Sequence, residues 1–322
     1  TFPKVAKYYG MLGELYQAMG MDEKALEAYN QLLVQDPKNA YVHLSLADYY
    51  RSHNQKDKAS DEIKVAFKNK DLDIDTEIKI LLSFYNITEN HAELKADAME
   101  LCKILVDAHP EEAKAFAMYG DFLFRDKKDD EARVQYRKAI SLDKEKFALW
   151  NQLLLLDSEL NDYLSMEKES KEAIDLFPNQ PLAYLFNADA NMRLKKYEEA
   201  VLALKQGKEY IIDNKQLSCQ FYGLLGDAFN YLKRHKDSDD AYDKALEYNP
   251  TDLSVLNNYS YYLSLRKTKL EKAELMSKKC NDLQPNNSSY QDTYGWILFQ
   301  EQKYDDAKVW IGKALENNGH KR

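Results

Sequence analysis

Carboxylate side chains recur along this chain at regular intervals. Glu14, Asp48, Asp121, Asp189 and Asp227 are separated by steps near 34 residues or near a multiple of 34. Carboxylates stacked along one concave surface lower its electrostatic potential and attract cationic groups. The chemistry that this spacing offers is recognition of a basic or amide-rich segment, provided that the fold places the five side chains on one face.

The residues do not indicate catalysis, metal binding or cofactor binding. The six His are scattered, and none has a second His or Cys at ligand spacing; the G-x-G-x-x-G, P-loop and H-E-x-x-H motifs are absent. His43 is expected to be a packed imidazole, and Cys102 and Cys280 occupy helix positions that suit a small apolar filler. We therefore predict no catalytic residue, no metal ligand and no cofactor, and expect that the chain is not an enzyme.

Composition narrows the class of protein. The 322 residues are 44% apolar and 31% charged, with only 10 Gly and 7 Pro, which favours a folded helical chain. A net charge of −9 disfavours a nucleic-acid partner, because binding to phosphates depends on clustered Lys and Arg. No apolar run is long enough to span a bilayer. Three cysteines far apart in sequence, with no C-x-x-C, do not indicate a disulfide framework.

A short frame repeats through the sequence. YGWILFQEQKYDDA at 294–307 matches YGDFLFRDKKDDEA at 119–132, and further copies begin at 12, 46, 187 and 225. Five prolines follow helical stretches at the same place in the repeat: Pro37, Pro110, Pro178, Pro250 and Pro285. Together they divide the chain into nine units: 6–39, 40–73, 74–112, 113–146, 147–180, 181–218, 219–252, 253–287 and 288–321. These units cover nearly the whole chain and leave no second domain.

The periodicity within a unit predicts two helices. Apolar residues at positions 4, 7, 8 and 11 and at 20, 24 and 27 follow helical spacing, with a turn near positions 15–17. Position 8 is small in most units and position 20 is usually Ala, so the two helices can approach closely. A lone helix pair cannot bury such faces, so the units must stack into an all-α solenoid.

This spacing resembles the tetratricopeptide repeat family, with its W/Y-x-x-L-G-x-x-Y, A-x-x-x-F/Y-x-x-A and Pro pattern. The weakest copies are 74–112, with Leu81 at the small position, and 147–180, with Leu154 there and Met166 in place of Ala. The resemblance implies a right-handed superhelix over residues 1–322, as a single domain of roughly one full turn. It also implies that the first helices of the units line a concave groove, through which the protein binds another protein.

In that family, positions 2, 5, 9 and 12 of the first helix face the groove. Position 9 carries the five carboxylates and then Leu82, Leu155, Tyr261 and Trp296. Two interpretations stay open. The carboxylates can pair with Arg on their own helix, as Asp48 with Arg51, Asp121 with Arg125 and Asp189 with Arg193. Alternatively, Asp48, Asp121, Asp189 and Asp227 select a basic or amide-rich partner. Position 5 holds no Lys, and Asn258 is the only Asn at position 6 in the nine units. We therefore expect neither a Lys and Asn clamp for a partner's C-terminal carboxylate nor a ladder of Asn side chains along the groove.

The last two units differ from the others. An aromatic and amide surface is expected from Asn257, Asn258, Tyr261, Asp292, Trp296 and Phe299. Such residues anchor interfaces because they combine apolar area with a polar group. The alternative is that the rings pack between neighbouring first helices. Val309, Trp310 and Ile311 in the final helix have no evident cover, which leaves three alternatives: a homodimer through the C-terminal repeat, a cap from residues beyond 322, or tolerated exposure.

The function expected from these features is a non-enzymatic scaffold that binds a protein or peptide segment in its groove. The alternative is the substrate-docking arm of a larger enzyme, or of a secretion or envelope assembly. RNA binding by helical repeats is disfavoured by the carboxylates. The D-T-Y-G-W-I-L run at 292–298 is similar to the closing repeats of bacterial envelope-associated repeat proteins, which favours an envelope or periplasmic location over a cytoplasmic one.

Overall fold

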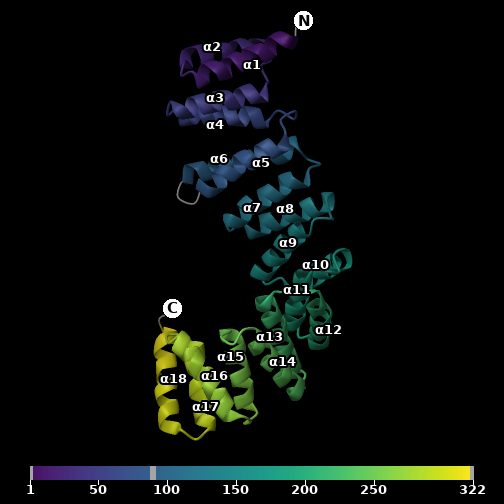
Figure 1. Ribbon diagram of the computed structural model, residues 1–322, viewed down its shortest axis with the longest axis vertical. Coiled ribbons are helices and arrows are strands. Elements are labelled where there is room, and N and C mark those ends of the chain that lie inside the picture. The colour runs from purple at the N-terminus through teal and green to yellow at the C-terminus, as the bar shows by residue number, and fades with distance from the viewer. Residues whose placement is uncertain (1–2, 88–91, 320–322) are drawn as a thin grey trace. The chain divides into compact units, whose positions relative to one another are not determined.

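Every regular element that the structure describes is helical (Figure 1). The computed structural model describes residues 3–87 and 92–319, and none of these residues lies in a strand. They fall into two compact units, Thr1–Leu156 and Asp157–Arg322. The predicted all-α repeat fold is confirmed, whereas the continuity of the nine repeats as one superhelical domain stays a prediction.

The first unit consists of four helix pairs and most of a ninth helix. Its helices are α1 (Pro3–Ala18), α2 (Asp22–Gln35), α3 (Ala40–Ser52), α4 (Lys56–Phe67), α5 (Ile74–Ile87), α6 (Ala92–Ala108), α7 (Ala113–Arg125), α8 (Asp129–Leu142) and α9 (Phe147–Glu159), of which the last extends into the second unit. Each of the four pairs coincides with one predicted repeat.

The second unit continues the same alternation. Its helices are α10 (Tyr163–Leu176), α11 (Pro181–Arg193), α12 (Tyr197–Gly207), α13 (Lys215–Tyr231), α14 (His235–Tyr248), α15 (Leu253–Leu265), α16 (Leu270–Leu283), α17 (Ser288–Gln300) and α18 (Tyr304–Gly319), with a 3₁₀ turn at Lys208–Tyr210. α13 begins at Lys215, four residues before the predicted repeat boundary at 219. α11 contacts α13, α13 contacts α15, and α15 contacts α17, so the first helices of these repeats form one continuous face.

A glycine facing a tyrosine sets the distance between the paired helices. A Cβ atom added to Gly226 of α13 would lie 2.7 Å from the ring of Tyr242 in α14, and one added to Gly120 of α7 would lie 2.8 Å from Tyr136 in α8. Both rings are buried. The small residue at position 8 therefore makes room for the aromatic ring at position 24, as the repeat pattern indicated.

The turns between paired helices close with one residue in the left-handed conformation. Asn54, Lys127, Asn161, Lys195 and Lys233 all have φ between 57° and 61°, two residues after the end of a first helix. This is the usual way to end a helix, although Gly is the residue that adopts it at least cost. The prolines mark the other ends, because Pro37, Pro110, Pro178, Pro250 and Pro285 each lie two residues beyond a second helix, as predicted.

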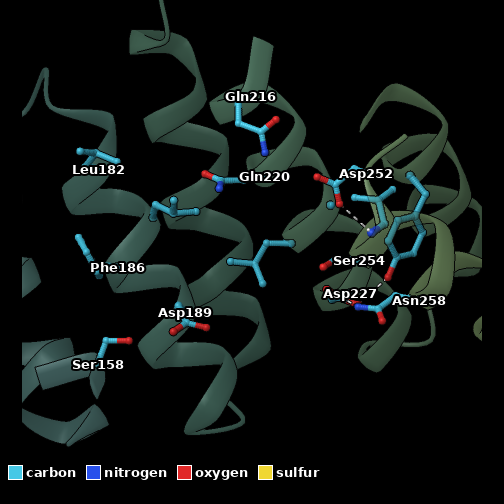
Figure 2. Close-up of a pocket in the computed structure, with 15 residues that line it drawn as sticks. Ser158, Leu182, Phe186, Asp189, Gln216, Gln220, Asp227, Asp252, Ser254 and Asn258 are labelled. Atoms are coloured by element: carbon cyan, nitrogen blue, oxygen red, sulfur yellow. Dashed lines mark hydrogen bonds between the residues drawn. The ribbon is translucent and has the colours of Figure 1, made fainter. Parts of the chain in front are cut away.

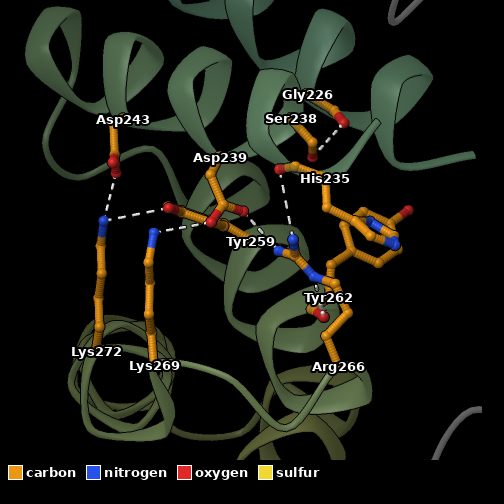
Figure 3. A network of polar contacts seen from close by, with 10 residues as sticks. All are labelled: Gly226, His235, Ser238, Asp239, Asp243, Tyr259, Tyr262, Arg266, Lys269 and Lys272. Carbon is orange, nitrogen blue, oxygen red and sulfur yellow. Dashed lines mark hydrogen bonds and ion pairs between the residues drawn. The ribbon is translucent and has the colours of Figure 1, made fainter. Parts of the chain in front are cut away.

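A network of charged side chains joins α14 to the next repeat (Figure 3). Asp239 is 8% exposed, and its carboxylate accepts hydrogen bonds from Arg266 Nη2 at 2.6 Å and Lys269 Nζ at 2.8 Å. Lys272 Nζ pairs with Asp243 and lies over the ring of Tyr259. Lys269, like Lys267, has a positive φ, so this turn contains two left-handed residues. The network therefore holds an unusual turn against the preceding repeat.

Several packing predictions are confirmed. His43 is 7% exposed; its Nδ1 lies 2.5 Å from Glu62 Oε2 and its Nε2 lies 3.1 Å from the Pro37 carbonyl. Cys102 and Cys280 are fully buried. The expectation that the whole 309–311 stretch lacks cover is wrong. Trp310 packs edge-to-face on Tyr294 within its own repeat, and Ile311 lies against Gly295. Val309 remains 56% exposed.

Candidate functional site

The second unit contains a groove of about 520 Å³ on its face of first helices (Figure 2). It lies along α11, α13 and α15, with Ser158 of α9 at one end. Apart from Gln216, which precedes the predicted repeat boundary at 219, the lining residues of α11 and α13 fall at positions 2, 5, 6 and 9 of their repeats. Positions 2, 5 and 9 are among the four that the family resemblance assigns to the groove, whereas position 6 is not, and no described residue at position 12 lines this groove.

One wall of this groove is apolar. Leu182, Leu185 and Phe186 of α11 line it, together with Leu224 of α13 and Val255 of α15. Leu182 is 36% exposed, while Leu185, Phe186 and Leu224 are half-buried. A partner that covered these side chains would remove apolar surface from water, which favours association.

The polar part of the groove is acidic. Asp189, Asp227 and Asp252 line it, and none of the fifteen described lining residues is Lys, Arg or His. Gln216, Gln220 and Asn258 supply amides. The surroundings of these three carboxylates differ, so they offer different chemistry to a partner.

Asp227 is already bound within the protein. Its Oδ1 accepts hydrogen bonds from the Tyr242 hydroxyl at 2.6 Å and from Asn258 Nδ2 at 3.2 Å. Burial raises the pKa of the Asp227 carboxyl, and these hydrogen bonds oppose the rise. The side chain is a structural acceptor at the floor of the groove and not a free surface charge.

Asp189 is the more available carboxylate. It is half-buried on α11, and Arg193 Nε lies 3.6 Å from its Oδ1. An ion pair of this kind, between partly exposed side chains, contributes little to stability and can be displaced. Asp252 caps α15, because its Oδ1 accepts a hydrogen bond from the Val255 N–H at 3.1 Å.

In the first unit, the predicted site residues have two different environments. Asp48 of α3 is exposed and pairs with Arg51 at 2.6 Å, as the i,i+3 spacing indicated. Asp121 of α7 instead accepts the Tyr136 hydroxyl at 2.7 Å, and Arg125 donates to the Tyr85 carbonyl and lies over its ring. The Asp121 side chain is half-buried, and the loss of solvation raises the pKa of its carboxyl. The Asp–Tyr hydrogen bond within a repeat was missed because it joins residues 15 apart on different helices.

The predicted C-terminal surface is partly exposed. Tyr261 of α15 is 38% exposed and Phe299 of α17 is 45% exposed. Trp296 is half-buried, stacks on Phe299 with 5.6 Å between ring centroids, and has a covered Nε1 with no hydrogen-bond acceptor among the described residues. Asp292 is exposed and Asn257 is half-buried. Tyr304 extends this aromatic surface, since it meets the Phe299 ring edge-on.

A second groove of about 540 Å³ lies in the first unit. Gly10, Met11 and Glu14 of α1 line it, with Tyr41, Val42 and Ser45 of α3. These are again positions 5, 6 and 9 of one repeat and 2, 3 and 6 of the next. Positions 2 and 6 thus contribute to both grooves. The sequence signal for position 6 is its helical spacing, four residues after position 2 and three before position 9.

The described part of the chain contains neither a group of metal ligands nor a helix that could cross a membrane. Residues 3–87 and 92–319 hold no group of three or more His, Cys, Asp or Glu side chains arranged to bind a metal ion. Within those same ranges, no helix is long and apolar enough to cross a bilayer.

Comparison with known proteins identifies the repeat. The tetratricopeptide repeat family model matches residues 6–39, 113–146 and 220–252, which are the first, fourth and seventh predicted repeats to within one residue. A chain in the crystal structure of the APC/C hetero-tetramer Cut9–Hcn1 is similar in fold over 97% of this chain and 73% of its own length, with a TM-score of 0.54 at 14% identity.

Two curated proteins match part of the sequence. Human protein O-mannosyl-transferase TMTC3 is 27% identical over 215 residues, which are 66% of this chain and 23% of that protein. The TPR repeat-containing protein PA4667 of Pseudomonas aeruginosa is 28% identical over 134 residues, which are 41% of this chain and 22% of that protein. The chain thus spans less than a quarter of the length of either relative. The chain therefore contains tetratricopeptide repeats within an all-α repeat fold, and repeats of this kind are typical of protein–protein interaction scaffolds.

Proposed function

We propose that this protein is a non-enzymatic scaffold that holds a segment of a partner protein in the groove of α11, α13 and α15. The observation that carries the proposal is the groove itself, about 520 Å³ in volume, with an apolar wall beside three carboxylates. Grooves that bind proteins or peptides combine apolar area with a few placed polar groups.

The charge of the groove favours a basic or amide-rich segment. Asp189 and Asp252 line it without any cationic neighbour among the lining residues, and the whole chain carries a net charge of −9. A concave surface with one sign of charge concentrates its field and steers oppositely charged partners toward it. In the first unit, considered by itself, Asp48 of α3 is an exposed carboxylate that a basic segment could contact, whereas Asp121 is bound to Tyr136.

The C-terminal repeats add a second contact area in this proposal. Tyr261 and Phe299 are exposed, and Trp296 stacks beneath Phe299. Asn257 and Asp292 provide polar groups on the same first helices. Rings of this kind bury a large apolar area on association and are frequent among the residues that dominate binding energy.

A matched pair of substitutions tests the groove. Leu182→Glu places a charge in the apolar wall, whereas Leu202→Glu makes the same change on α12, where Leu202 is 63% exposed and does not line the groove. Partners captured by the wild-type chain and identified by mass spectrometry should be retained by Leu202→Glu and lost by Leu182→Glu. Equal capture by both variants would reject the groove as the binding site.

A second candidate function is the docking arm of a larger enzyme, or of a secretion or envelope assembly. The match to human O-mannosyl-transferase TMTC3, of which this chain spans 23%, supports an enzyme-linked role. Determination of the complete reading frame tests the enzyme form: a catalytic domain continuous with residues 1–322 would support it, and a reading frame without such a domain would remove it.

A homodimer through the C-terminal repeat also belongs to the proposal. Val309 and Leu315 of α18 are 56% and 70% exposed, which leaves apolar surface for a second copy to cover. Sedimentation at several concentrations should show a monomer–dimer equilibrium that Leu315→Glu shifts to monomer. A wild-type chain that sediments as a monomer at every concentration would contradict this part of the proposal.

A further inference from the structure

The contacts of Asp227 determine which way the Asn258 amide points. The side-chain nitrogen of Asn258 is the amide atom that faces Asp227, and as a donor it suits a carboxylate acceptor. This nitrogen lies 3.2 and 3.5 Å from the two Asp227 oxygens (Figure 2). Tyr242 donates to the same carboxylate from the other helix of the repeat and holds it in place. The Asn258 carbonyl oxygen is consequently the amide atom left for a partner.

Hydrogen-bond acceptors therefore dominate the polar lining. Among the described residues, Asn258 presents its carbonyl, Asp189 presents a carboxylate that pairs with Arg193 at 3.6 Å, and Asp252 caps α15 through Oδ1. Gln216 and Gln220 are partial exceptions, because their amide nitrogens can donate, and the Oε1 of Gln216 already accepts from Asn249 at 3.2 Å. The hydroxyls of Ser158 and Ser254 can donate or accept. Such a lining is satisfied by a partner group with several donors and no acceptor.

Arginine is the side chain that fits this description best. Its guanidinium carries five N–H donors in a flat fork and a delocalised charge that is only weakly hydrated, so it can satisfy several acceptors at once. Lysine is a compact, strongly hydrated point charge. Arg193 of the protein itself already draws toward Asp189, at 3.6 Å, and shows that this carboxylate accepts a guanidinium neighbour.

We propose that the groove selects an arginine side chain of the bound segment, with Asp189 and the Asn258 carbonyl as its contacts and Leu182 and Phe186 against an adjacent apolar residue. Asp227 is a positioning residue in this arrangement, because it acts through Asn258. The inference rests on the proposed function of the groove and adds the identity of the recognised side chain.

Four hexapeptide pools test it, each with one central residue fixed as arginine, lysine, citrulline or glutamine beside a fixed leucine. Citrulline has the shape of arginine without its charge and with an acceptor in place of one donor group. Each pool is titrated against the full chain by fluorescence anisotropy. The arginine pool should bind about tenfold more tightly than the lysine pool, and its advantage over the citrulline pool should be larger still. Asp189→Asn should reduce the arginine-to-citrulline ratio about tenfold, whereas Asp240→Asn, on the exposed surface of α14, should leave it unchanged.

The positioning role has its own readout. Asp227→Asn offers a donor to Asn258 and allows its amide to turn, so the arginine-to-citrulline ratio should fall toward one at temperatures where the variant is fully folded. If Asp227 acted only on stability, Asp227→Asn would lower the melting temperature and leave the arginine-to-citrulline affinity ratio unchanged. Arg193→Ala should tighten arginine binding a few-fold, because it removes an internal competitor.

The outcomes separate this inference from the proposed function. If the arginine and citrulline pools bind the wild type equally, and Leu182→Glu abolishes both, the groove binds a segment and the arginine selectivity is wrong. If no pool binds the wild-type chain, both the selectivity and the groove proposal are overturned.

Discussion

The hydroxyl of Tyr242 donates a 2.6 Å hydrogen bond to Asp227, and Tyr136 makes the same contact with Asp121 at 2.7 Å. In both repeats the acceptor is on the groove face of the first helix and the donor is a buried ring of the second helix. Because the ring occupies the space that the glycine at position 8 leaves open, packing and hydrogen bonding depend on one another.

Tyr242→Phe should lower the free energy of unfolding by about 1–3 kcal/mol, because it removes one donor to a buried carboxylate while the ring volume is kept. Urea denaturation followed by circular dichroism measures the change. Tyr304→Phe is the matched control: Tyr304 is 57% exposed, so its variant should unfold within about 0.5 kcal/mol of the wild type. A similar small effect for Tyr242→Phe would contradict the structural role of the contact.

Gly226→Ala should destabilise the fold by about 1–3 kcal/mol, because the new methyl group would lie 2.7 Å from a Tyr242 ring carbon and the ring is buried. Gly312→Ala is the control in α18, where an added Cβ meets nothing within 4 Å; this variant should be more stable by about 0.5–1 kcal/mol, since Ala favours the helix. Thermal melts of the two variants should therefore shift in opposite directions. Shifts of the same sign would show that the ring moves aside without cost.

A buried pair in the first unit should make stability depend on pH. Glu77 of α5 is fully buried, and its Oε2 lies 2.6 Å from Nε2 of His109, which follows the last residue of α6. Burial, with the nearby Asp73 charge, raises the pKa of Glu77 to about 8. The pKa of His109 is lowered, mainly by burial, although Glu112 and Asp73 act in the opposite direction and Lys70 in the same one.

The direction in which stability changes with pH follows from the difference between the folded and unfolded pKa values of each group. Glu77 binds its proton more tightly in the folded state, so its contribution is complete below the unfolded pKa near 4.5 and is lost as the pH rises through about 8. His109 contributes above its ordinary value near 6.5, and that contribution is lost as the pH falls through the lowered pKa. Wild-type stability should therefore fall from pH 7 to 9, and Glu77→Gln should remove most of this slope. Denaturation curves with parallel slopes for the two proteins would contradict the assignment.

Asp239→Ala should cost about 3 kcal/mol, because it leaves Arg266, a largely buried side chain, without its carboxylate partner. Although burial raises the Asp239 pKa, the hydrogen bonds from Lys269 and Arg266 outweigh it and lower the pKa overall. The contribution is then present above the unfolded value near 3.8 and is lost as the pH falls through the lowered pKa. Asp240→Ala, one residue along on the exposed side, should change the unfolding free energy by less than about 0.5 kcal/mol. Equal effects of the two substitutions would contradict the role of the network.

Much of the local structure was predictable because it depends on contacts within about 34 residues. Helical spacing, the prolines after second helices and the small residue at position 8 together predicted the helix pairs. The resemblance to the tetratricopeptide repeat family added the face of the first helices that is expected to line the groove. The pairing of Asp48 with Arg51 followed in the same way, since both side chains belong to one turn of one helix. In the turns, residues such as Lys127 and Lys195 adopt the left-handed conformation without the glycine that would have marked it.

Residue types and their spacing by themselves determined that this chain is a stack of helix pairs with acidic side chains on the groove face. Only the tertiary structure decided which of those carboxylates are available. Asp121 and Asp227 receive hydroxyl donors from a second helix, and Asp227 an amide from the next repeat, whereas Asp189 does not share these partners. The reason is physical: a spacing along the chain specifies a face, but burial and hydrogen-bond partners depend on side chains that meet only after the helices pack.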